Sequence, residues 1–104
     1  MRFLFMILMC LAVITVSAQK GKITGTISDE ITGESLIQAT VVFQQSGESP
    51  QGVLTDFDGR FSIELDYGTY TMKISYVGYE PIEREVVLNR PKLDLNVKLE
   101  TIML

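Results

Sequence analysis

Residues 60–76 read RFSIELDYGTYTMKISY, and this run is the strongest indication of the fold. Apolar side chains occupy every second position on both sides of the turn Asp66-Tyr67-Gly68. A period of two is typical of β-strands that bury one face, because successive side chains of a strand point to opposite sides. The run therefore predicts two neighbouring strands, 61–65 and 70–76, joined by a short turn.

The alternation continues in both directions from this run. It predicts further strands over 22–28, 39–44, 52–55, 82–88 and 93–99, separated by segments rich in turn-forming residues. The run 82–88 is less regular, because Arg84 shares the parity of Ile82 and Val86; either its side chain reaches the sheet edge or a bulge resets the register. About seven short strands with one apolar face each predict an all-β fold, a seven-stranded antiparallel β-sandwich.

The N-terminus has the three-part pattern of a secretory signal peptide. Arg2 supplies a positive charge, residues 3–16 are almost wholly apolar, and small residues follow at Ser17 and Ala18. The apolar run is shorter than the ~20 residues that cross a bilayer as a helix, so a cleaved signal is favoured over a membrane anchor. We therefore expect a signal peptide over residues 1–18 and one domain over residues 19–104.

Cys10 is the single cysteine and lies inside the apolar run. A lipoprotein signal requires a small residue before the lipid-bearing cysteine, but Met9 precedes Cys10 and the run continues past it. Cleavage after Ala18 would leave a chain with neither disulfide nor thiol chemistry.

Composition excludes several classes of function. Acidic residues outnumber basic ones by 13 to 9, for a formal net charge of −4, whereas nucleic-acid binding depends on basic contacts with phosphate. The chain contains no histidine, which removes the commonest general base and a common metal ligand. No phosphate-binding glycine loop or nucleophile elbow is present. We expect no enzyme, no catalytic residue, no cofactor and no metal.

The segment Asp56-Phe57-Asp58-Gly59 is the sharpest candidate site. Two carboxylates two residues apart before a glycine are similar to the start of a calcium loop. The remaining ligands of such a loop are missing from the sequence, and Asp-Gly is also a common hairpin turn. The plain turn is the favoured interpretation, with calcium as the alternative.

Two further groups of side chains contain residue types that occur in functional sites. Glu83 and Glu85 point to the same side of one strand, which favours a solvated face over a catalytic pair. An aromatic ligand platform would need the four tyrosines together. The parity of Tyr70 and Tyr76 instead predicts core packing, and Tyr67 and Tyr79 lie at corners, where a hydroxyl can bond to the backbone.

Three segments in order, residues 25–41, 52–63 and 70–79, resemble the carboxypeptidase-regulatory-like domain, a transthyretin-like seven-stranded sandwich. The resemblance covers nearly all of the chain after residue 18. The same module is familiar at the N-terminus of TonB-dependent outer-membrane receptors of the starch-utilisation type, directly after a signal peptide. The zinc peptidase that gave the family its name is not implied, because its site needs histidine.

The resemblance implies a non-catalytic interaction or accessory module in the periplasm or at the outer membrane of a Gram-negative bacterium. Its expected partner is another envelope protein, with no nucleic acid and no membrane span after signal cleavage. The sequence stops about where a linker to a receptor plug would begin, so a truncated receptor is one hypothesis. A stand-alone carbohydrate- or peptide-binding domain is the alternative function. The oligomeric state and the open edge strand stay undefined.

Overall fold

The computed structural model describes residues 19–102. The predicted signal peptide over residues 1–18 lies outside the described residues. Within the described range, no helix is long and apolar enough to cross a membrane. The strands are β1 (Lys20–Asp29), β2 (Thr40–Gln44), β3 (Gln51–Leu54), β4 (Arg60–Asp66), β5 (Gly68–Ser75), β6 (Ile82–Leu88) and β7 (Lys92–Leu99).

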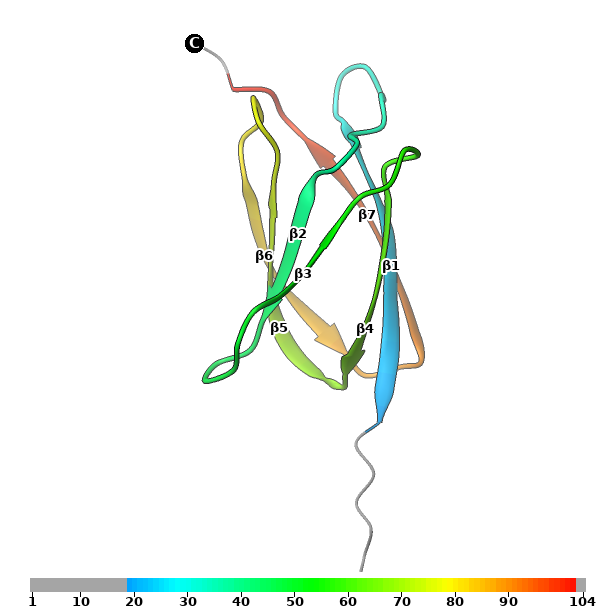
Figure 1. The fold of residues 1–104 in the computed structure, drawn as a ribbon, viewed down its shortest axis with the longest axis vertical. Helices are drawn as coiled ribbons and strands as arrows, with labels where there is room; N and C mark the ends of the chain where they lie inside the picture. Colours follow the sequence, from blue (N-terminus) through cyan, green and yellow to red (C-terminus); the bar gives the residue numbers. More distant parts are fainter. Residues whose placement is uncertain (1–18, 103–104) are drawn as a thin grey trace, which may run out of the picture.

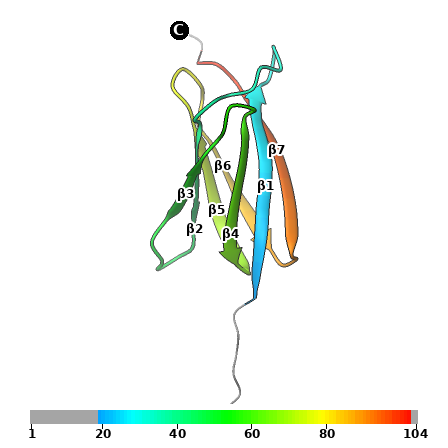
Figure 2. The same ribbon diagram turned by 45° about the vertical axis from the view of Figure 1, so that its right-hand side comes forward.

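The strands form two sheets that pack face to face (Figures 1 and 2). One sheet has three strands in the order β4-β1-β7, and the other has four in the order β3-β2-β5-β6. The predicted all-β sandwich of seven strands is therefore confirmed. Each predicted strand is present within two residues of its expected bounds.

One strand pair differs from the fully antiparallel prediction. β1 and β7 pair in parallel, with Ile23 opposite Leu93 and Ile27 opposite Val97. The reason is topological, because every strand reverses the direction of the one before it and strands one and seven therefore run the same way. Cross-strand side chains support this pairing: the Thr24 hydroxyl donates to the Asp94 carboxylate at 3.1 Å.

The core lies between the sheets and is built from the alternate residues that the sequence predicted. The Phe43 ring of β2 lies at its centre, with its centroid 6.4 Å from that of Phe61 in β4 and 6.3 Å from that of Tyr70 in β5. Gly25 provides the space for Phe61, because a Cβ at this position would overlap the Phe61 ring and the Leu95 carbonyl oxygen. The side chains that are almost fully buried come from both sheets: Ile23, Ile27, Val41, Phe43, Leu65, Met72, Ile74, Leu88 and Leu99.

The register of β6 resolves the irregular pattern around Arg84. Met72, Ile74 and Tyr70 of β5 lie opposite Arg84, Ile82 and Val86, without a bulge. Arg84 therefore stands at a core-facing position but is exposed. Its side chain reaches out at the sheet edge, which β6 forms, because the long aliphatic stem lets the charge stay in water.

Thr55 fixes the connection that leads into β2. Its buried hydroxyl donates to the Leu36 carbonyl oxygen at 2.6 Å and accepts from the Ala39 N–H at 2.8 Å. The Gln38 N–H donates to the Thr55 carbonyl oxygen at 3.0 Å, while Gln38 has a φ of 60°. A non-glycine residue in this left-handed region is strained and needs surrounding contacts to hold it. Thr55 supplies those contacts.

Replacement of Thr55 by valine should therefore destabilise the fold. The loss of the hydroxyl leaves the Leu36 carbonyl and the Ala39 N–H with unmet hydrogen bonds, which costs about 1–3 kcal/mol of unfolding free energy. Urea unfolding of Thr55→Val, Thr55→Ser and wild type measures this cost. Thr55→Ser retains most of the stability, and Thr71→Val, at an exposed position of β5, should change it by less than about 0.5 kcal/mol. Equal stability of Thr55→Val and wild type would contradict this role.

Candidate functional site

The connections β1–β2, β3–β4 and β5–β6 gather at one end of the sandwich, together with residues 100–102 (Figures 1 and 2). We call this surface the loop end and define it as residues 30–39, 55–59, 76–81 and 100–102. β1 ends there at Asp29, and its first residue, Lys20, lies at the opposite end. Since both sheets contribute loops, the loop end is the place where residues distant in sequence meet.

The Asp29 carboxylate connects segments of the loop end that are distant in the sequence. Its Oδ1 accepts from the N–H groups of Ile31 at 2.8 Å and Thr32 at 2.9 Å, and its Oδ2 accepts from the Tyr79 hydroxyl at 2.7 Å. Asp29 is buried, with 7% of its surface exposed. The hydrogen bonds from Thr32, Tyr79 and Ile31 lower the pKa of Asp29, because each of them favours the charged form. The carboxylate thus links β1 of one sheet to the β5–β6 turn of the other.

Tyr79 is the partner of Asp29 and also packs on Tyr76. The two tyrosine ring centroids are 5.5 Å apart with planes at 59°. The hydrogen bond to Asp29, burial and the negative charge of Asp29 raise the pKa of Tyr79 to about 12. A phenol with this pKa stays protonated at neutral pH, so it serves as the hydrogen-bond donor to Asp29.

The Asp56 turn is a tight turn held by its own carboxylate. Asp56 Oδ1 accepts from the N–H groups of Asp58 and Arg60, each at 2.9 Å, and these bonds lower the pKa of Asp56. Gly59 has a φ of 72°, and a Cβ there would press on the Ile27 carbonyl oxygen. The favoured turn interpretation of this segment agrees with this geometry. The flanking strands β3 and β4 belong to different sheets, however, so the turn crosses between sheets and does not join a paired hairpin.

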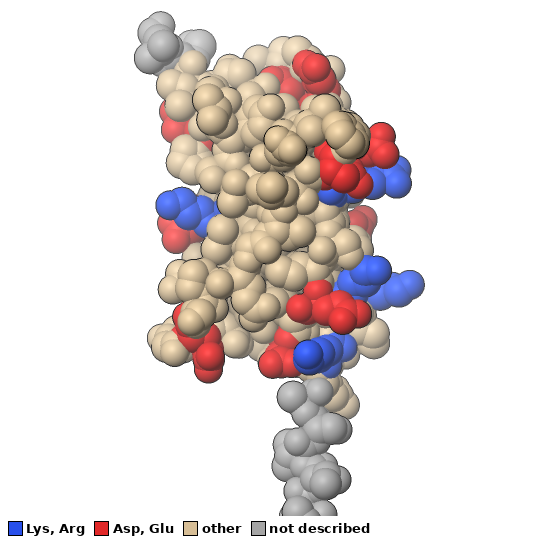
Figure 3. All heavy atoms as spheres, viewed as in Figure 1, with Lys and Arg blue, Asp and Glu red and all other residues tan. Residues whose placement is uncertain are grey.

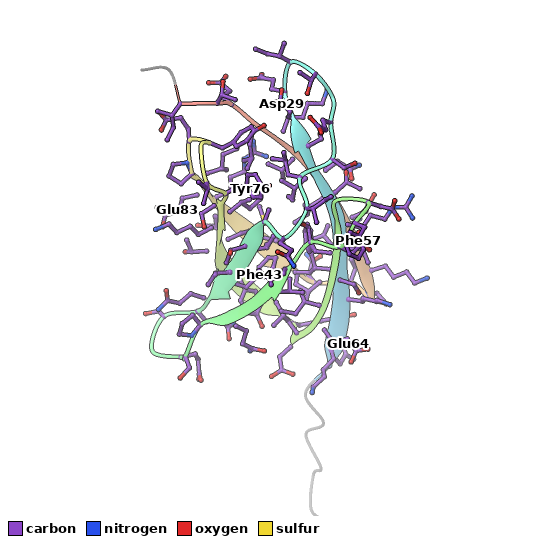
Figure 4. All side chains as sticks on the ribbon, turned by 45° about the horizontal axis from the view of Figure 1, so that its top comes forward. Asp29, Phe43, Phe57, Glu64, Tyr76 and Glu83 are labelled. Carbon is purple, nitrogen blue, oxygen red and sulfur yellow. The ribbon has the colours of Figure 1, made fainter. Side chains whose placement is uncertain are left out.

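The other candidate residues are dispersed. Glu83 and Glu85 are exposed on β6, with Lys73 opposite Glu83, as Figure 4 shows for Glu83 at the outer side of the molecule. The four tyrosines divide between the two ends and do not form one platform. Tyr70 is buried and its hydroxyl donates to the Asp66 carbonyl oxygen at 2.6 Å; burial and the charge of Asp66 raise its pKa. A hydroxyl bond to the backbone was expected from the corner tyrosines Tyr67 and Tyr79. The structure shows such a bond for Tyr70, whereas the Tyr79 hydroxyl bonds to a carboxylate.

Sequence reasoning missed the principal residues of the loop end. The sequence places Asp29 at the start of a turn-rich connection, and nothing in one sequence shows that Tyr79, fifty residues later, donates to it. The sequence places Phe57 and Val77 in turns, but it did not show that their side chains are exposed at the same end of the fold as that of Ile37. Two shallow hollows meet at Ile37: Val77 lines one and Phe57 lines the other. Figure 4 shows Asp29, Tyr76 and Phe57 around this end, with Glu64 near the opposite one.

The loop end does not provide a metal site in the described part of the chain. Across residues 19–102, no three side chains of the ligating types gather closely enough to hold an ion. Every buried side-chain nitrogen or oxygen in that range has a hydrogen-bond partner. Glu30 and Glu100 form an exposed pair in which the hydrogen bond with Glu100 and its negative charge raise the pKa of Glu30.

Asp29 should make stability sensitive to acid. Because its pKa is lower in the folded state, its contribution is present above the pKa of the unfolded chain and is lost as pH falls through the folded value. Asp29→Asn should be less stable at pH 7 and should lose less stability between about pH 5 and pH 2. Urea unfolding across this range measures the slope. Asp58→Asn is the control and should keep the wild-type slope; equal slopes for Asp29→Asn and wild type would contradict the assignment.

Tyr79 should make the stability of the fold fall at high pH. It ionises near pH 10 in an unfolded chain but has a pKa of about 12 in the fold, so stability declines as pH rises between these values. Absorbance at the tyrosinate band should show a late ionisation step near pH 12 that Tyr79→Phe lacks. In Asp29→Asn the step should move to lower pH, because its main cause is gone. Identical titrations of all three proteins would rule out the Asp29–Tyr79 bond.

Comparison with known proteins gives the family. The sequence model of the CarboxypepD_reg-like domain family matches residues 23–104 of this chain. A TonB-dependent receptor P39 from Formosa agariphila is 35% identical over 85 residues, which cover 78% of this chain and 7% of the receptor. The chain therefore spans a small part of the length of this relative.

Solved structures agree on the fold. A 3-chlorocatechol 1,2-dioxygenase from Rhodococcus opacus has a TM-score of 0.71 and 12% identity over 83% of this chain and 61% of its own. A putative membrane-associated protein from Bacteroides fragilis has a TM-score of 0.62 and 28% identity over 83% of this chain and 29% of its own. The dioxygenase resemblance is one of fold alone. With the matched model covering most of the chain, the protein belongs to the CarboxypepD_reg-like (carboxypeptidase-regulatory-like) domain family.

Proposed function

We propose that the protein is a non-catalytic accessory domain of a TonB-dependent nutrient receptor, acting on the periplasmic side of the outer membrane. The observation that carries the proposal is the 35% identity with a TonB-dependent receptor across 78% of this chain. Membership of a regulatory-like domain family supports it further. The export expected from the N-terminal sequence is consistent with that compartment.

The shifted pKa values at the loop end support binding over catalysis. Asp29 and Asp56 have lowered pKa values because backbone N–H groups bond to their carboxylates, which is the reverse of what a general acid needs at neutral pH. Tyr79 has a raised pKa and donates its proton to a structural bond. These groups therefore use their hydrogen-bonding capacity to hold loops in place.

A carbohydrate-binding role is the second candidate, and one feature favours it. The outer face of the three-stranded sheet carries a shallow hollow lined by hydroxyl, amide and charged groups, including Ser62, Arg60 and Asn96. Such groups can bond to sugar hydroxyls. The Thr24 and Thr26 hydroxyls of the same face already donate to Asp94 and Asn96, which reduces the number of free donors. The receptor-associated role therefore ranks first.

Deletion in the source organism tests the receptor-associated role. Residues 19–102 are removed in frame from the gene product, and growth is measured on a panel of polysaccharides as sole carbon source. We expect slower growth on the polysaccharide that the associated receptor imports, with an unchanged amount of receptor in the outer membrane by immunoblot. Supplying the full chain from a second locus should restore growth.

Three outcomes would count against the proposal. Unchanged growth on every receptor-dependent polysaccharide would remove the accessory role. Turnover of a polysaccharide by the purified chain, lost on removal of one of its carboxylates, would show an enzyme. Binding to a glycan array without any growth defect would favour the carbohydrate-binding candidate.

A further inference from the structure

The loop end exposes apolar side chains from every segment that composes it. Val77 is 94% exposed, Ile31 89% and Phe57 84%, and Ile37 and Ile102 are 40% and 44% exposed. A small sandwich with a well-filled core leaves single apolar residues on its surface routinely, but a group of them at one place marks a contact site. Ile31 and Ile37 lie in the β1–β2 connection, Phe57 in β3–β4 and Val77 in β5–β6, and Ile102 lies in residues 100–102.

These side chains form a connected surface. One hollow is lined by Ile37, Tyr76 and Val77, and a second is lined by Ile37 and Phe57, so the two meet at Ile37. The Ile102 N–H donates to the Gly78 carbonyl oxygen at 3.0 Å, which places Ile102 beside the Val77 turn. The apolar surface therefore extends across three connections and the last described residues.

The charged residues within the loop end are all acidic, and a smaller number of basic side chains lies beside them: Arg84 and Lys98 line a hollow with Glu30, Glu80 and Glu100, and Arg60 follows the Asp56 turn. The four segments of the loop end contain no Lys or Arg, and their charged residues are Glu30, Glu34, Asp56, Asp58, Glu80 and Glu100. In Figure 3 the centre of the viewed face is uncharged and carboxylates flank its upper end, with basic atoms beside those at the upper right. The opposite end is mixed, because it includes Lys20, Arg90 and Lys92. Glu100 raises the pKa of Glu30 and the positive charge of Lys98 lowers it, and the raising effect is the larger, so a net repulsion between like charges remains at this end.

Internal hydrogen bonds fix the loops in the absence of a partner. Asp29 bonds the β1–β2 connection to Tyr79, Thr55 bonds the segment around Gln38, and Asp56 closes its own turn. Binding to a preorganised surface avoids much of the entropy cost of ordering loops. The apolar tips are therefore presented in a fixed arrangement.

We propose that the loop end is a docking surface for a basic polypeptide segment that carries exposed apolar side chains. The inference deepens the accessory role proposed above by naming the chemistry of the partner. Charge complementarity selects the occupant, because Lys or Arg of the partner would face the carboxylate rim while its apolar side chains cover Ile37, Phe57 and Val77. An anionic lipid surface and a second copy of this end would both meet like charge.

Three peptides of equal length test the partner chemistry: alternating Lys-Leu, alternating Lys-Ser and alternating Glu-Leu. The full chain, purified after expression in an exporting host, is titrated with each, and amide chemical shifts locate the contact. We expect the Lys-Leu peptide to bind at residues 30–39, 55–59 and 76–81, the Lys-Ser peptide to bind about tenfold more weakly, and the Glu-Leu peptide not to bind. Affinity for Lys-Leu should fall as salt is raised.

Matched variants separate this surface from non-specific attraction. Phe57→Ser with Val77→Ser should weaken Lys-Leu binding by about tenfold, whereas Val87→Ser, an exposed valine of β6, should change it by less than about twofold. Asp58→Lys with Glu34→Lys should weaken binding by about tenfold, and Glu48→Lys with Glu64→Lys, which alters net charge equally, should have a smaller effect. All these side chains are exposed, and circular dichroism checks that each variant keeps the fold.

Several results would overturn the docking surface. The first is that the control variants weaken Lys-Leu binding as much as the loop-end variants do, and the second is that the peptide shifts amide signals only outside the loop end. The others are tighter binding of the chain to vesicles of anionic phospholipid than to Lys-Leu, and a dimer of the chain that forms through Phe57 and Val77. A failure here is distinguishable from failure of the accessory role. If the deletion slows growth but no Lys-Leu binding occurs at the loop end, the receptor-associated function stands and only the partner chemistry is wrong.

Discussion

The arrangement of the loop end depends on one carboxylate. Asp29 ends the central strand of the three-stranded sheet, and its two oxygens accept from Ile31, Thr32 and Tyr79. Tyr79 belongs to the turn after β5, so this carboxylate connects the two sheets at the place where their loops meet. A buried carboxylate is stable only with such partners, because burial without them strongly disfavours the charge. The hydrogen bonds therefore decide both the ionisation of Asp29 and the positions of the loops.

The two ends of the sandwich consequently differ in chemistry. At the loop end, carboxylates in the connections hold backbone N–H groups, and apolar side chains are left at the tips because no core remains for them to enter. At the other end, Tyr70 is buried and its hydroxyl closes on the backbone of Asp66. A tyrosine hydroxyl therefore donates to an aspartate at each end. Tyr79 donates to the carboxylate of Asp29, and Tyr70 donates to the backbone carbonyl of Asp66.

The edges of the four-stranded sheet offer a less favourable place for a partner than the loop end. β6 forms one edge of the four-stranded sheet and carries the consecutive charges Glu83, Arg84 and Glu85. Charged residues on an edge strand discourage the addition of another strand. β3 forms the other edge but spans only Gln51–Leu54, which limits the number of backbone hydrogen bonds it could offer. The loops combine larger apolar exposure with an excess of acidic residues, so we place the interaction there.

The sequence by itself determined the strands, their inward faces and the class of fold. A period of two is a local property, and it needs no knowledge of which strand lies beside which. Thus Phe43, Met72 and Ile74 were assigned to apolar faces before their partners were known, and the turn at Asp56-Gly59 was recognised from its residue types. The parallel pairing of β1 with β7 and the placement of that turn between sheets required the topology.

Only the tertiary structure decided the candidate site. Asp29 and Tyr79 meet across fifty positions of sequence, and Ile37, Phe57 and Val77 come from three separate connections. Whether an apolar residue in a loop is buried or exposed depends on the other loops that surround it, and no local pattern contains that information. The sequence therefore shows the chemical type of each residue. It does not show which residues become neighbours at the loop end, because the packing of the two sheets determines that.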